Sequence, residues 1–582
     1  MKEQKNYPLY EVTPVNSIRE LLEIAEKEAG DKHAFKYRNG SSIIEITYRE
    51  FIKDVNAIGT ALTERGVIGN HIAQIGDNSY RWITIYLAAL AGNGVYVPVD
   101  KELPETDILN ILVHSDSDIL FYTPRYDEII KNHKDTTLAH YKYFIRILND
   151  STDHAGEQLP DYASGDNRFM TYGSLVLRGM ELLDGGNQEY FAKKSNPTEL
   201  KMIVYTSGTT GLQKGVMLSE HNLVSIVYYG LQVSTVYDTS LSVLPYHHTY
   251  EAVAGLLVSL HHHTTICIND AIKNVVKNLG QFKPEFIYIV PAFAEEFYRR
   301  IWATAKKNGK EKGLKLLLKV SKGLRKVGID KRRELFGMIH ETFGGNLRKI
   351  VCGGAPLRPE IADFFDDIGI DFINGYGITE CSPLVAANRD RFNDPTTVGC
   401  VLPCCEVKLE DVTPEGIGEI CVKGDIVMLG YYKMPEITAE VLSDDGWFAT
   451  GDYGKINELE QLIITGRKKN IIVLNNGKNI YPEEIENYIQ SIPYVKEVIV
   501  YSLKNEHGEE TKLCAEVFLN DEKVKELGIT DTTSTLKADV TKVCAPLPSY
   551  KNVSKIIIRQ TEFAKTTTNK IKRQGLGEGV TE

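Results

Sequence analysis

Strand-like apolar runs alternate with helical patterns through most of the first 460 residues, and this alternation limits the possible folds more than any other feature of the sequence. Residues 42–47 have the pattern of a strand and residues 48–64 have helical spacing. The helical run 79–91 is likewise followed by the strand-like run 95–99. Strands separated by helices of this length predict parallel sheets covered by helices. We therefore expect an α/β protein.

The pattern changes twice toward the C-terminus. From Thr397, short strands and turns with many prolines and glycines indicate a small β-rich subdomain. After Gly466 the chain has the pattern of a small α+β domain, with helices and strands predicted at 482–491, 495–502, 512–519, 534–545 and 555–559. We predict a large N-terminal domain over 1–466 and a small C-terminal domain over 467–582. The polar stretch 149–196 is expected to be a surface excursion or a linker.

Composition limits the class of protein. The 582 residues are 42% hydrophobic and 25% charged, which is ordinary for a globular protein, and the net charge of −11 argues against a nucleic-acid binder. The N-terminus lacks the apolar core of a secretory signal, and the apolar stretch 82–99 is interrupted at Gly92-Asn93-Gly94. Nine cysteines without a CxxC pair suit reduced thiols. We expect a cytoplasmic protein without a membrane span.

The run Tyr205–Gly215 (YTSGTTGLQKG) is rich in groups that bind phosphate. Its glycines let the backbone turn tightly and bring N–H groups close to a ligand, while its hydroxyls and Lys214 supply donors and positive charge. It is not a Walker loop, because Gly215 follows the lysine where that motif has Ser or Thr. We predict a phosphate loop between a strand at 200–204 and a helix starting near Asn222. The alternative is a polar linker.

Four further motifs each have an ordinary explanation when taken alone. In GYGITE, residues 375–380, the tyrosine could stack on a flat base and Glu380 could ligate a hard cation, or the motif could be a tight turn. Asp452 follows a glycine and could form a turn or accept the hydroxyls of a ribose. The basic segments 466–469 and 565–573 could be solvated. Their order along the chain is more informative than any one of them.

Together these motifs closely resemble the adenylate-forming superfamily, which includes acyl-CoA synthetases, peptide-synthetase adenylation domains and luciferases. The resemblance extends from the region of Trp82 and Pro98 to Lys570. The phosphate loop, GYGxTE, TGD, GRxK and KTxxxK elements occur in the order of the family. The resemblance implies an N-terminal AMP-binding domain of helix-flanked sheets and a C-terminal domain that turns about a hinge.

The resemblance also implies roles for individual residues. The matching positions of the ATP site are the phosphate loop Thr206, Ser207, Gly208, Thr209, Thr210, Gly211 and Lys214, the adenine-side turn Gly353, Gly354, Ala355 and Pro356, and the stacking Tyr376 between Gly375 and Gly377. The remaining matches are Thr379 for the α-phosphate, Glu380 for Mg²⁺, Asp452 and Arg467 for the ribose, Lys469 for the hinge and Lys570 for catalysis of the first half-reaction. Asn569 stands where many members have glycine.

The segment Leu244–Glu251 (LPYHHTYE) matches the part of the family that borders the substrate carboxylate. Members that activate amino acids have an aspartate there, and this segment has none. Its pattern is most similar to long-chain acyl-CoA synthetases. His248 is the candidate catalytic histidine near the carboxylate and the CoA, although His247 and His248 could equally be core residues. The run His261–His263 is expected to be a loop or strand end rather than a metal site.

The segment 299–333 is strongly basic in an acidic protein, with Glu311 and Asp330 as its only acids. Leu314, Leu317, Leu318 and Leu324 give part of it an apolar face. One interpretation is a peripheral contact with an anionic membrane, which would place the protein at the inner membrane surface. The other is a solvated basic face over a strip of core residues.

The sequence therefore predicts an AMP-forming acid:CoA ligase that uses ATP, Mg²⁺ and CoA and acts on a fatty acid, with a long chain favoured. The alternatives within the superfamily are a ligase that loads a separate carrier protein and a ligase for aryl or medium-chain acids. A non-catalytic nucleotide-binding protein is a further alternative, but the motif residues are intact. No nucleic-acid partner is expected, and oligomeric state has no signal in the sequence.

Overall fold

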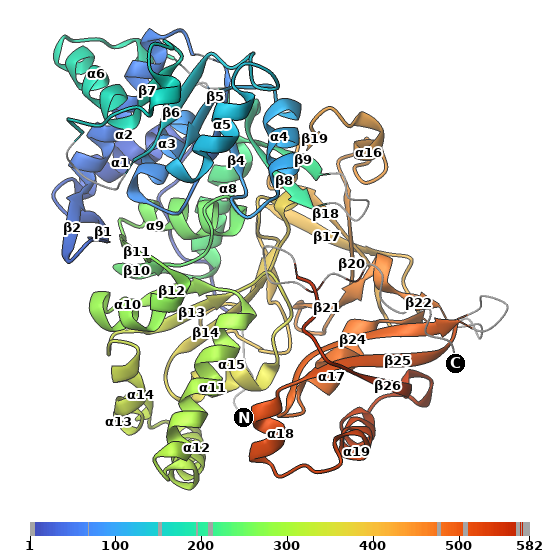
Figure 1. Cartoon of the computed structure of the whole chain (residues 1–582). Helices are drawn as coiled ribbons and strands as arrows, with labels where there is room; N and C mark the ends of the chain where they lie inside the picture. The colour runs from blue at the N-terminus through green and yellow to red at the C-terminus, as the bar shows by residue number, and fades with distance from the viewer. Residues whose placement is uncertain are drawn as a thin grey trace. The chain divides into compact units, whose positions relative to one another are not determined.

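A computed structural model of the chain describes residues 6–67, 69–92, 94–148, 154–193, 196–207, 213–473, 479–504, 510–565, 571 and 573. The chain divides into two compact units (Figure 1). The first comprises 1–356, 360–406 and 422–448, and the second comprises 357–359, 407–421 and 449–582. The predicted boundary at 466/467 stays a prediction.

The first unit contains a nine-stranded sheet whose central strands are parallel. The strand order is β16-β15-β14-β13-β12-β10-β11-β1-β2. Antiparallel strands complete both edges of the sheet. The bounds are β1 His33–Asn39, β2 Ser42–Thr47, β10 Thr239–Ser242, β11 Thr265–Ile268, β12 Phe286–Ile289, β13 Lys349–Cys352, β14 Asp371–Tyr376, β15 Ala386–Ala387 and β16 Cys400–Val401.

An eight-stranded sheet in the same unit has the order β19-β9-β8-β4-β3-β5-β6-β7. Strands β3 to β7 pair in parallel, whereas β8, β9 and β19 pair antiparallel to one another. The bounds are β3 His71–Ile75, β4 Val95–Val99, β5 Ser117–Tyr122, β6 Tyr143–Arg146, β7 Phe169–Thr171, β8 Leu200–Ser207, β9 Gln213–Ser219 and β19 Gly430–Tyr431.

Helices cover both faces of the eight-stranded sheet, among them α3 (Tyr80–Ala91) and α4 (Glu105–His114). Val95, Val97 and Val99 share a buried cluster with Ile108 and Ile111 of α4, because alternate strand residues point to one face. On the other face the ring of Tyr96 contacts Trp82 and Tyr86 of α3, at centroid distances of 5.5 and 5.1 Å. Helix α3 is buried throughout, so the apolar stretch 82–99 is a core helix followed by a core strand. Among the described residues, no helix is long and apolar enough to span a membrane.

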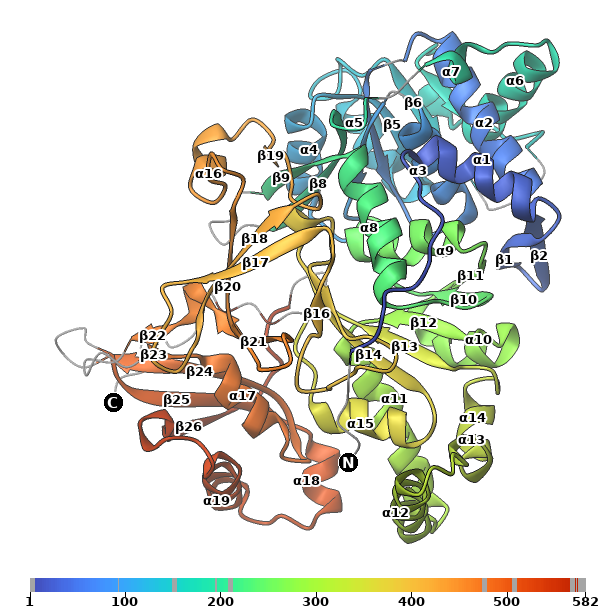
Figure 2. The ribbon, with the colours of Figure 1, turned by 180° about the vertical axis from the view of Figure 1, so that it is seen from behind.

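The helices of the first unit are visible from two sides in Figures 1 and 2. Their bounds are α1 Ile18–Ala29, α2 Tyr48–Glu64, α3 Tyr80–Ala91, α4 Glu105–His114, α5 Asp127–His133, α6 Tyr172–Asp184, α7 Glu189–Ala192, α8 Glu220–Val233, α9 Val258–His261, α10 Val275–Phe282, α11 Pro291–Lys307, α12 Glu311–Lys326, α13 Arg332–Leu335, α14 Gly337–Thr342, α15 Pro359–Asp367 and α16 Pro435–Ala439.

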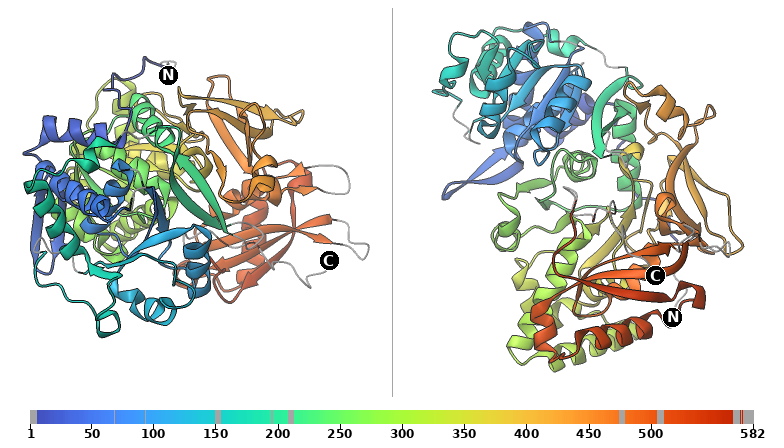
Figure 3. Two further views of the ribbon diagram at one scale, coloured as in Figure 1. Left: turned by 90° about the horizontal axis from the view of Figure 1, so that it is seen from above. Right: turned by 45° about the vertical axis from the view of Figure 1, so that its right-hand side comes forward.

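The second unit has its own hydrophobic core. Strands β24-β25-β26 form a three-stranded sheet, drawn in orange and red in Figure 3. Ile485 and Ile489 of α17 and Leu536 and Val540 of α19 are buried with its apolar side chains. A four-stranded sheet has the order β17-β18-β20-β21. The remaining bounds are β17 Cys405–Glu410, β18 Gly418–Gly424, β20 Phe448–Ile456, β21 Leu462–Arg467, β22 Ile472–Val473, β23 Asn479–Ile480, α17 Pro482–Gln490, β24 Val495–Lys504, β25 Glu510–Leu519, α18 Asp521–Glu526, α19 Thr532–Cys544 and β26 Val553–Arg559.

Two local predictions were wrong. The phosphate loop does not lead from a strand into a helix, because β9 (Gln213–Ser219) follows it and pairs antiparallel with β8. Helix α8 begins only at Glu220, directly after the seven residues of β9. The stretch 149–196 is not merely a linker, since it contains β7 and α6, and α6 packs against α2.

Candidate active site

Two predicted nucleotide-binding turns lie at the carboxyl ends of two neighbouring strands of the nine-stranded sheet. The turn Gly353–Pro356 follows β13, and Gly375-Tyr376-Gly377 ends the neighbouring parallel strand β14. A Cβ placed on Gly353 would lie 3.4 Å from the carbonyl oxygen of Gly375, so the two backbones are close. The carboxyl ends of parallel strands are the usual ligand-binding edge of such a sheet. The structure therefore brings these two motifs together.

The last position of the GYG turn, Gly377, can be occupied only by glycine. A Cβ on Gly377 would lie 1.6 Å from the carbonyl oxygen of Pro383. The amide of Val385 donates to the carbonyl of Tyr376 over 2.9 Å, which closes the turn. Thr379 and Glu380 then lie in a short 3₁₀ helix, Thr379–Cys381. This close approach explains the second glycine of the motif without any ligand.

Glu380 and Lys214 are linked through Tyr431. The Tyr431 hydroxyl donates to Oε1 of Glu380 over 2.9 Å, and Nζ of Lys214 lies 4.8 Å from the centroid of the same ring. Strand β19 holds Tyr431 against β9, with Tyr431 opposite Val216. Burial and the neighbouring Glu380 carboxylate raise the pKa of Tyr431, so the phenol keeps its proton. The structure thus adds Tyr431 to the sequence-predicted site.

The phosphate loop is the tip of the β8–β9 hairpin. Thr206 pairs with Lys214 and Ser207 with Gln213, which places both ends of the loop. Gly208, Thr209, Thr210 and Gly211 lie outside the described residues. Tyr205 precedes the loop and its hydroxyl lies 2.8 Å from Nδ1 of His114.

His247 and His248 lie beside Asp100, at the end of β4. Nε2 of His247 lies 3.3 Å from Oδ1 of Asp100, and the two histidine rings are 4.3 Å apart at their centroids. Burial, with His248 and Lys101 nearby, lowers the pKa of His247 well below its usual value, so its ring is neutral at pH 7. Asp100, His247 and His248 form a group whose possible metal-ligating atoms all lie within 4.8 Å of one another. It is the one such group of three among the described residues.

Glu251 does not face an open site. It is 1% exposed in the π-helix Tyr250–Leu257, where it accepts a hydrogen bond from the hydroxyl of Ser242. Burial raises its pKa to about 8. A Cβ on Gly255 would lie 2.7 Å from the carboxyl carbon, so the glycine makes room for this side chain. The only acid of the segment 244–251 is therefore a core residue.

The other predicted residues belong to the second unit. Nε of Arg467 lies 2.9 Å from Oδ1 of Asp452, so the two candidate ribose contacts form an ion pair. Asp452 is buried, and Thr450 supports its turn by accepting a hydrogen bond from the Asp452 amide over 3.0 Å. Lys469 lies in the short helix Lys468–Asn470 directly after β21. Lys570 lies outside the described residues.

The segment that contains Lys570 is held at both ends. Lys565 forms ion pairs with Glu497 at 2.5 Å and Glu562 at 3.1 Å, and Arg573 pairs with Glu486 at 2.6 Å. Burial raises the pKa of Glu486 to about 7 even beside Arg573. Sequence reasoning missed Tyr431 and Arg573, because each acts through a partner far away in the chain and neither lies in a periodic pattern.

The comparisons with known proteins identify the class. Residues 22–432 match the family of AMP-binding enzymes, and residues 469–578 match the AMP-binding enzyme C-terminal domain. The chain therefore belongs to the AMP-binding enzyme family, the adenylate-forming superfamily that its motifs resemble. By family it is therefore an AMP-binding enzyme that has both domains of that family.

Its relatives include fatty-acid ligases. The chain is 30% identical over 481 residues to the peroxisomal long chain acyl-CoA synthetase 7 of Arabidopsis thaliana, covering 78% of this chain and 66% of that protein. It is 29% identical over 479 residues to long-chain-fatty-acid–CoA ligase 1 of Homo sapiens, covering 78% and 67%. The alignments thus span about two-thirds of the length of these relatives.

Solved structures share the fold. An anthranilate CoA ligase in complex with anthranoyl-AMP has a TM-score of 0.75 at 18% identity, with 100% of this chain and 99% of that chain covered. ATP-bound MatB from Rhodopseudomonas palustris has a TM-score of 0.72 at 23% identity, with 97% and 99% covered. The predicted fold class, large N-terminal sheets with a small C-terminal domain, is confirmed.

Proposed function

We propose that this chain joins a fatty acid, with a long chain favoured, to CoA through an acyl-AMP intermediate. The observation that carries the proposal is the contact of Tyr431 with both Glu380 and Lys214, because it joins the candidate metal ligand to the candidate phosphate lysine. The family assignment and the names of the relatives support the reaction class and the fatty acid.

In the first half-reaction a carboxylate oxygen of the acid attacks the α-phosphorus of ATP, and the bond to pyrophosphate breaks. Lys214 would bind the departing phosphates, and Lys570 would offset the repulsion between the two anions at the reacting centre. Glu380 fits a hard cation, because the Tyr431 bond uses Oε1 and fixes the orientation of Oε2 in the same carboxylate. A magnesium ion bound there would neutralise phosphate charge.

In the second half-reaction the thiol of CoA attacks the acyl carbon and releases AMP. The proton of the thiol must leave as the thioester forms. The neutral ring of His247, held by Asp100, lies against His248, the residue we place at the substrate carboxylate. Rotation of the C-terminal domain about Lys469 would remove Lys570 and admit the thiol.

The segment 244–251 supports an acid without an α-amine. Glu251 is buried on Ser242, and Asp100 is engaged with His247. Neither the Glu251 nor the Asp100 carboxylate is therefore free to pair with the ammonium group of an amino-acid substrate. A hydrocarbon chain needs no such partner, which agrees with a fatty acid.

The test is pyrophosphate release from ATP with a panel of acids, with and without CoA. We expect release with long-chain fatty acids in preference to medium-chain ones, and thioester only when CoA is present. Acid-dependent pyrophosphate without thioester would instead favour transfer to a carrier protein. Preference for benzoate-type acids would favour an aryl ligase, and ATP binding without turnover would favour a non-catalytic role.

A further inference from the structure

Helix α12 is held to the first unit by one face. Leu314 and Ser321 are buried, and Leu317, Leu318 and Leu324 are half-buried. The hydroxyl of Ser321 donates to the carbonyl of Asp367 over 3.1 Å. The leucines that the sequence offered as an apolar face therefore pack inward and cannot form a surface for a membrane.

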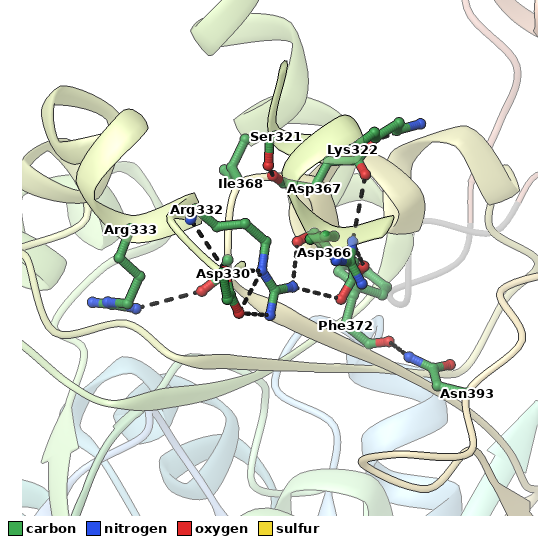
Figure 4. A network of polar contacts seen from close by, with 12 residues as sticks. Ser321, Lys322, Asp330, Arg332, Arg333, Asp366, Asp367, Ile368, Phe372 and Asn393 are labelled. Carbon is green, nitrogen blue, oxygen red and sulfur yellow. Dashed lines mark hydrogen bonds and ion pairs between the residues drawn. The ribbon is translucent and has the colours of Figure 1, made fainter. Parts of the chain in front are cut away.

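Two cations of α12 strengthen this attachment, and they belong to the region of polar contacts drawn in Figure 4. Nζ of Lys322 lies 2.9 Å from Asp367, and a guanidinium nitrogen of Arg325 lies 2.7 Å from Asp366. Arg332, just beyond the helix, also pairs with Asp366 at 3.0 Å. The two aspartates at the end of α15 thus fix the orientation of α12.

The opposite face of α12 carries an apolar strip that the sequence analysis did not isolate. Leu316 is 62% exposed, Val320 is 42% exposed and Val327 is 72% exposed. Leu316 and Val320 are four residues apart and lie on one side of the helix, and Val327 is the C-cap residue directly after its last turn. Helix α12 lies at the periphery of the first unit in Figures 1 and 2. Exposed apolar side chains that gather on one face can mark an interaction surface, whereas singly scattered ones do not.

A row of lysines runs beside this strip. Lys312, Lys319 and Lys326 are exposed and seven residues apart, so they lie on one side of the helix. Among the described residues, no carboxylate lies within 4.0 Å of any of these three ammonium groups. The acids near α12 are engaged elsewhere, since Glu311 pairs with Lys315 at 2.6 Å and Asp366 and Asp367 hold the inner face.

We propose that this outer face of α12, defined as Leu316, Val320, Val327, Lys312, Lys319 and Lys326, binds the surface of an anionic phospholipid bilayer. The helix would lie in the plane of the headgroups, with the apolar strip among the acyl chains and the lysines at the phosphates. Lysines near such a surface are attracted to its phosphates, and a helix with an apolar strip beside a basic strip matches both layers of that interface. The chain as a whole carries a charge of −11, so the attraction depends on this local patch.

The proposal does not depend on the proposed function, because it is tested without substrate. The purified full chain is sedimented with vesicles of phosphatidylcholine alone and with vesicles that contain phosphatidylglycerol. We expect binding only to the anionic vesicles, weakened by salt. The variant K312E/K319E/K326E should lose at least tenfold in partition coefficient, and L316S/V320S/V327S should lose several-fold.

The matched control reverses three exposed lysines of other helices, K27E/K53E/K131E, with the same change in net charge. It should bind like the wild type, and all variants should keep the wild-type circular dichroism and melting temperature. Equal loss in the control, equal binding to neutral vesicles, or full binding by either α12 variant would overturn the proposal. So would a lack of vesicle binding, including the case where the lysine row instead binds an acidic protein.

Discussion

The hydroxyl of Tyr431 donates a hydrogen bond to Oε1 of Glu380 over 2.9 Å, although 51 positions separate the two residues in the chain. The ring of the same tyrosine lies 4.8 Å from Nζ of Lys214. One side chain thus orients the carboxylate proposed for Mg²⁺ and contacts the lysine proposed for the phosphates. Strand β19, only Gly430–Tyr431 in length, owes its place in the site to pairing with β9.

The variant Tyr431→Phe should raise the magnesium concentration needed for half-maximal activity. It keeps the ring beside Lys214 but removes the bond that fixes Glu380. A hydrogen bond to a charged group contributes about 1.5–3 kcal/mol, so we expect turnover at limiting magnesium to fall about 10- to 100-fold. Pyrophosphate release measured over a magnesium titration checks this. Tyr432→Phe, which loses a bond to Asp116, is the control and should leave the titration unchanged.

Asp452 is expected to recognise the ribose of ATP. The variant Asp452→Ala should raise KM for ATP about 10- to 100-fold, because a buried carboxylate that accepts hydroxyl hydrogen bonds would be lost. The sharper measurement compares ATP with 2′,3′-dideoxy-ATP. The wild type should prefer ATP, and the variant should use both nucleotides with similar KM.

Arg467→Leu separates this role from a structural one. It removes the ion pair with Asp452 but leaves the carboxylate, so discrimination between the two nucleotides should survive in part. If Asp452→Ala still prefers ATP as strongly as the wild type does, Asp452 does not contact the ribose hydroxyls.

The elements with strong local signals were predictable. Helix α2 occupies Tyr48–Glu64 as predicted, since Thr47 and Glu50 form a capping box at its start. Helix α6 was missed because Gly173 and Gly179 disfavour a helix locally. A Cβ on Gly179 would lie 1.8 Å from the carbonyl of Ala57, so the glycine permits close packing on α2. Helix α6 therefore forms because of its tertiary packing against α2, and not because of its local sequence.

The candidate site, like the fold, was predictable where the signal is local in the sequence and was missed where it depends on tertiary packing. Motif residues such as Tyr376 and Glu380 were found from short-range spacing, and the structure places them at one sheet edge. Tyr431 was invisible, because a two-residue strand has no periodicity and its role arises from strand pairing. The hairpin around the phosphate loop was missed because Gly215 in β9 has the look of a loop residue, whereas its backbone pairs with Tyr205.

Glu251 should make stability depend on pH. Its pKa is about 8 in the folded state, above the usual 4.5, so the unfolded chain loses this proton first as pH rises. Stability is therefore lost between about pH 4.5 and pH 8, by at most about 5 kcal/mol. Glu251→Gln cannot titrate, so the free energy of unfolding of the variant relative to the wild type should increase from pH 5 to pH 9.

Urea unfolding at both pH values measures this difference. The exposed Glu23→Gln is the control, and its difference from the wild type should stay constant with pH. If the free energies of unfolding of Glu251→Gln and the wild type changed equally with pH, Glu251 would have an ordinary pKa in the folded state. The neighbouring groups Ser242, Tyr250 and Tyr288 do not titrate in this window, since burial keeps both phenol pKa values above it.

Lys570 is expected to serve only the first half-reaction. Ion pairs of Lys565 and Arg573 hold the two ends of its segment, so Lys570→Ala should leave the C-terminal domain folded. Loss of one preorganised charge at the reacting centre commonly costs about 100- to 1000-fold in rate. We expect acyl-AMP formation to fall by that amount, while thioester formation from supplied acyl-AMP stays near the wild-type rate.

The two rates are measured separately, by pyrophosphate release and by CoA consumption with synthetic acyl-AMP. Lys542→Ala, on the exposed side of α19, is the control and should affect neither. A domain rotation that removes Lys570 predicts this asymmetry, because the residue would be away from the anhydride when the thiol attacks. Equal loss of both half-reactions would mean that Lys570 remains at the reacting centre throughout, and the two-state cycle would have to be abandoned.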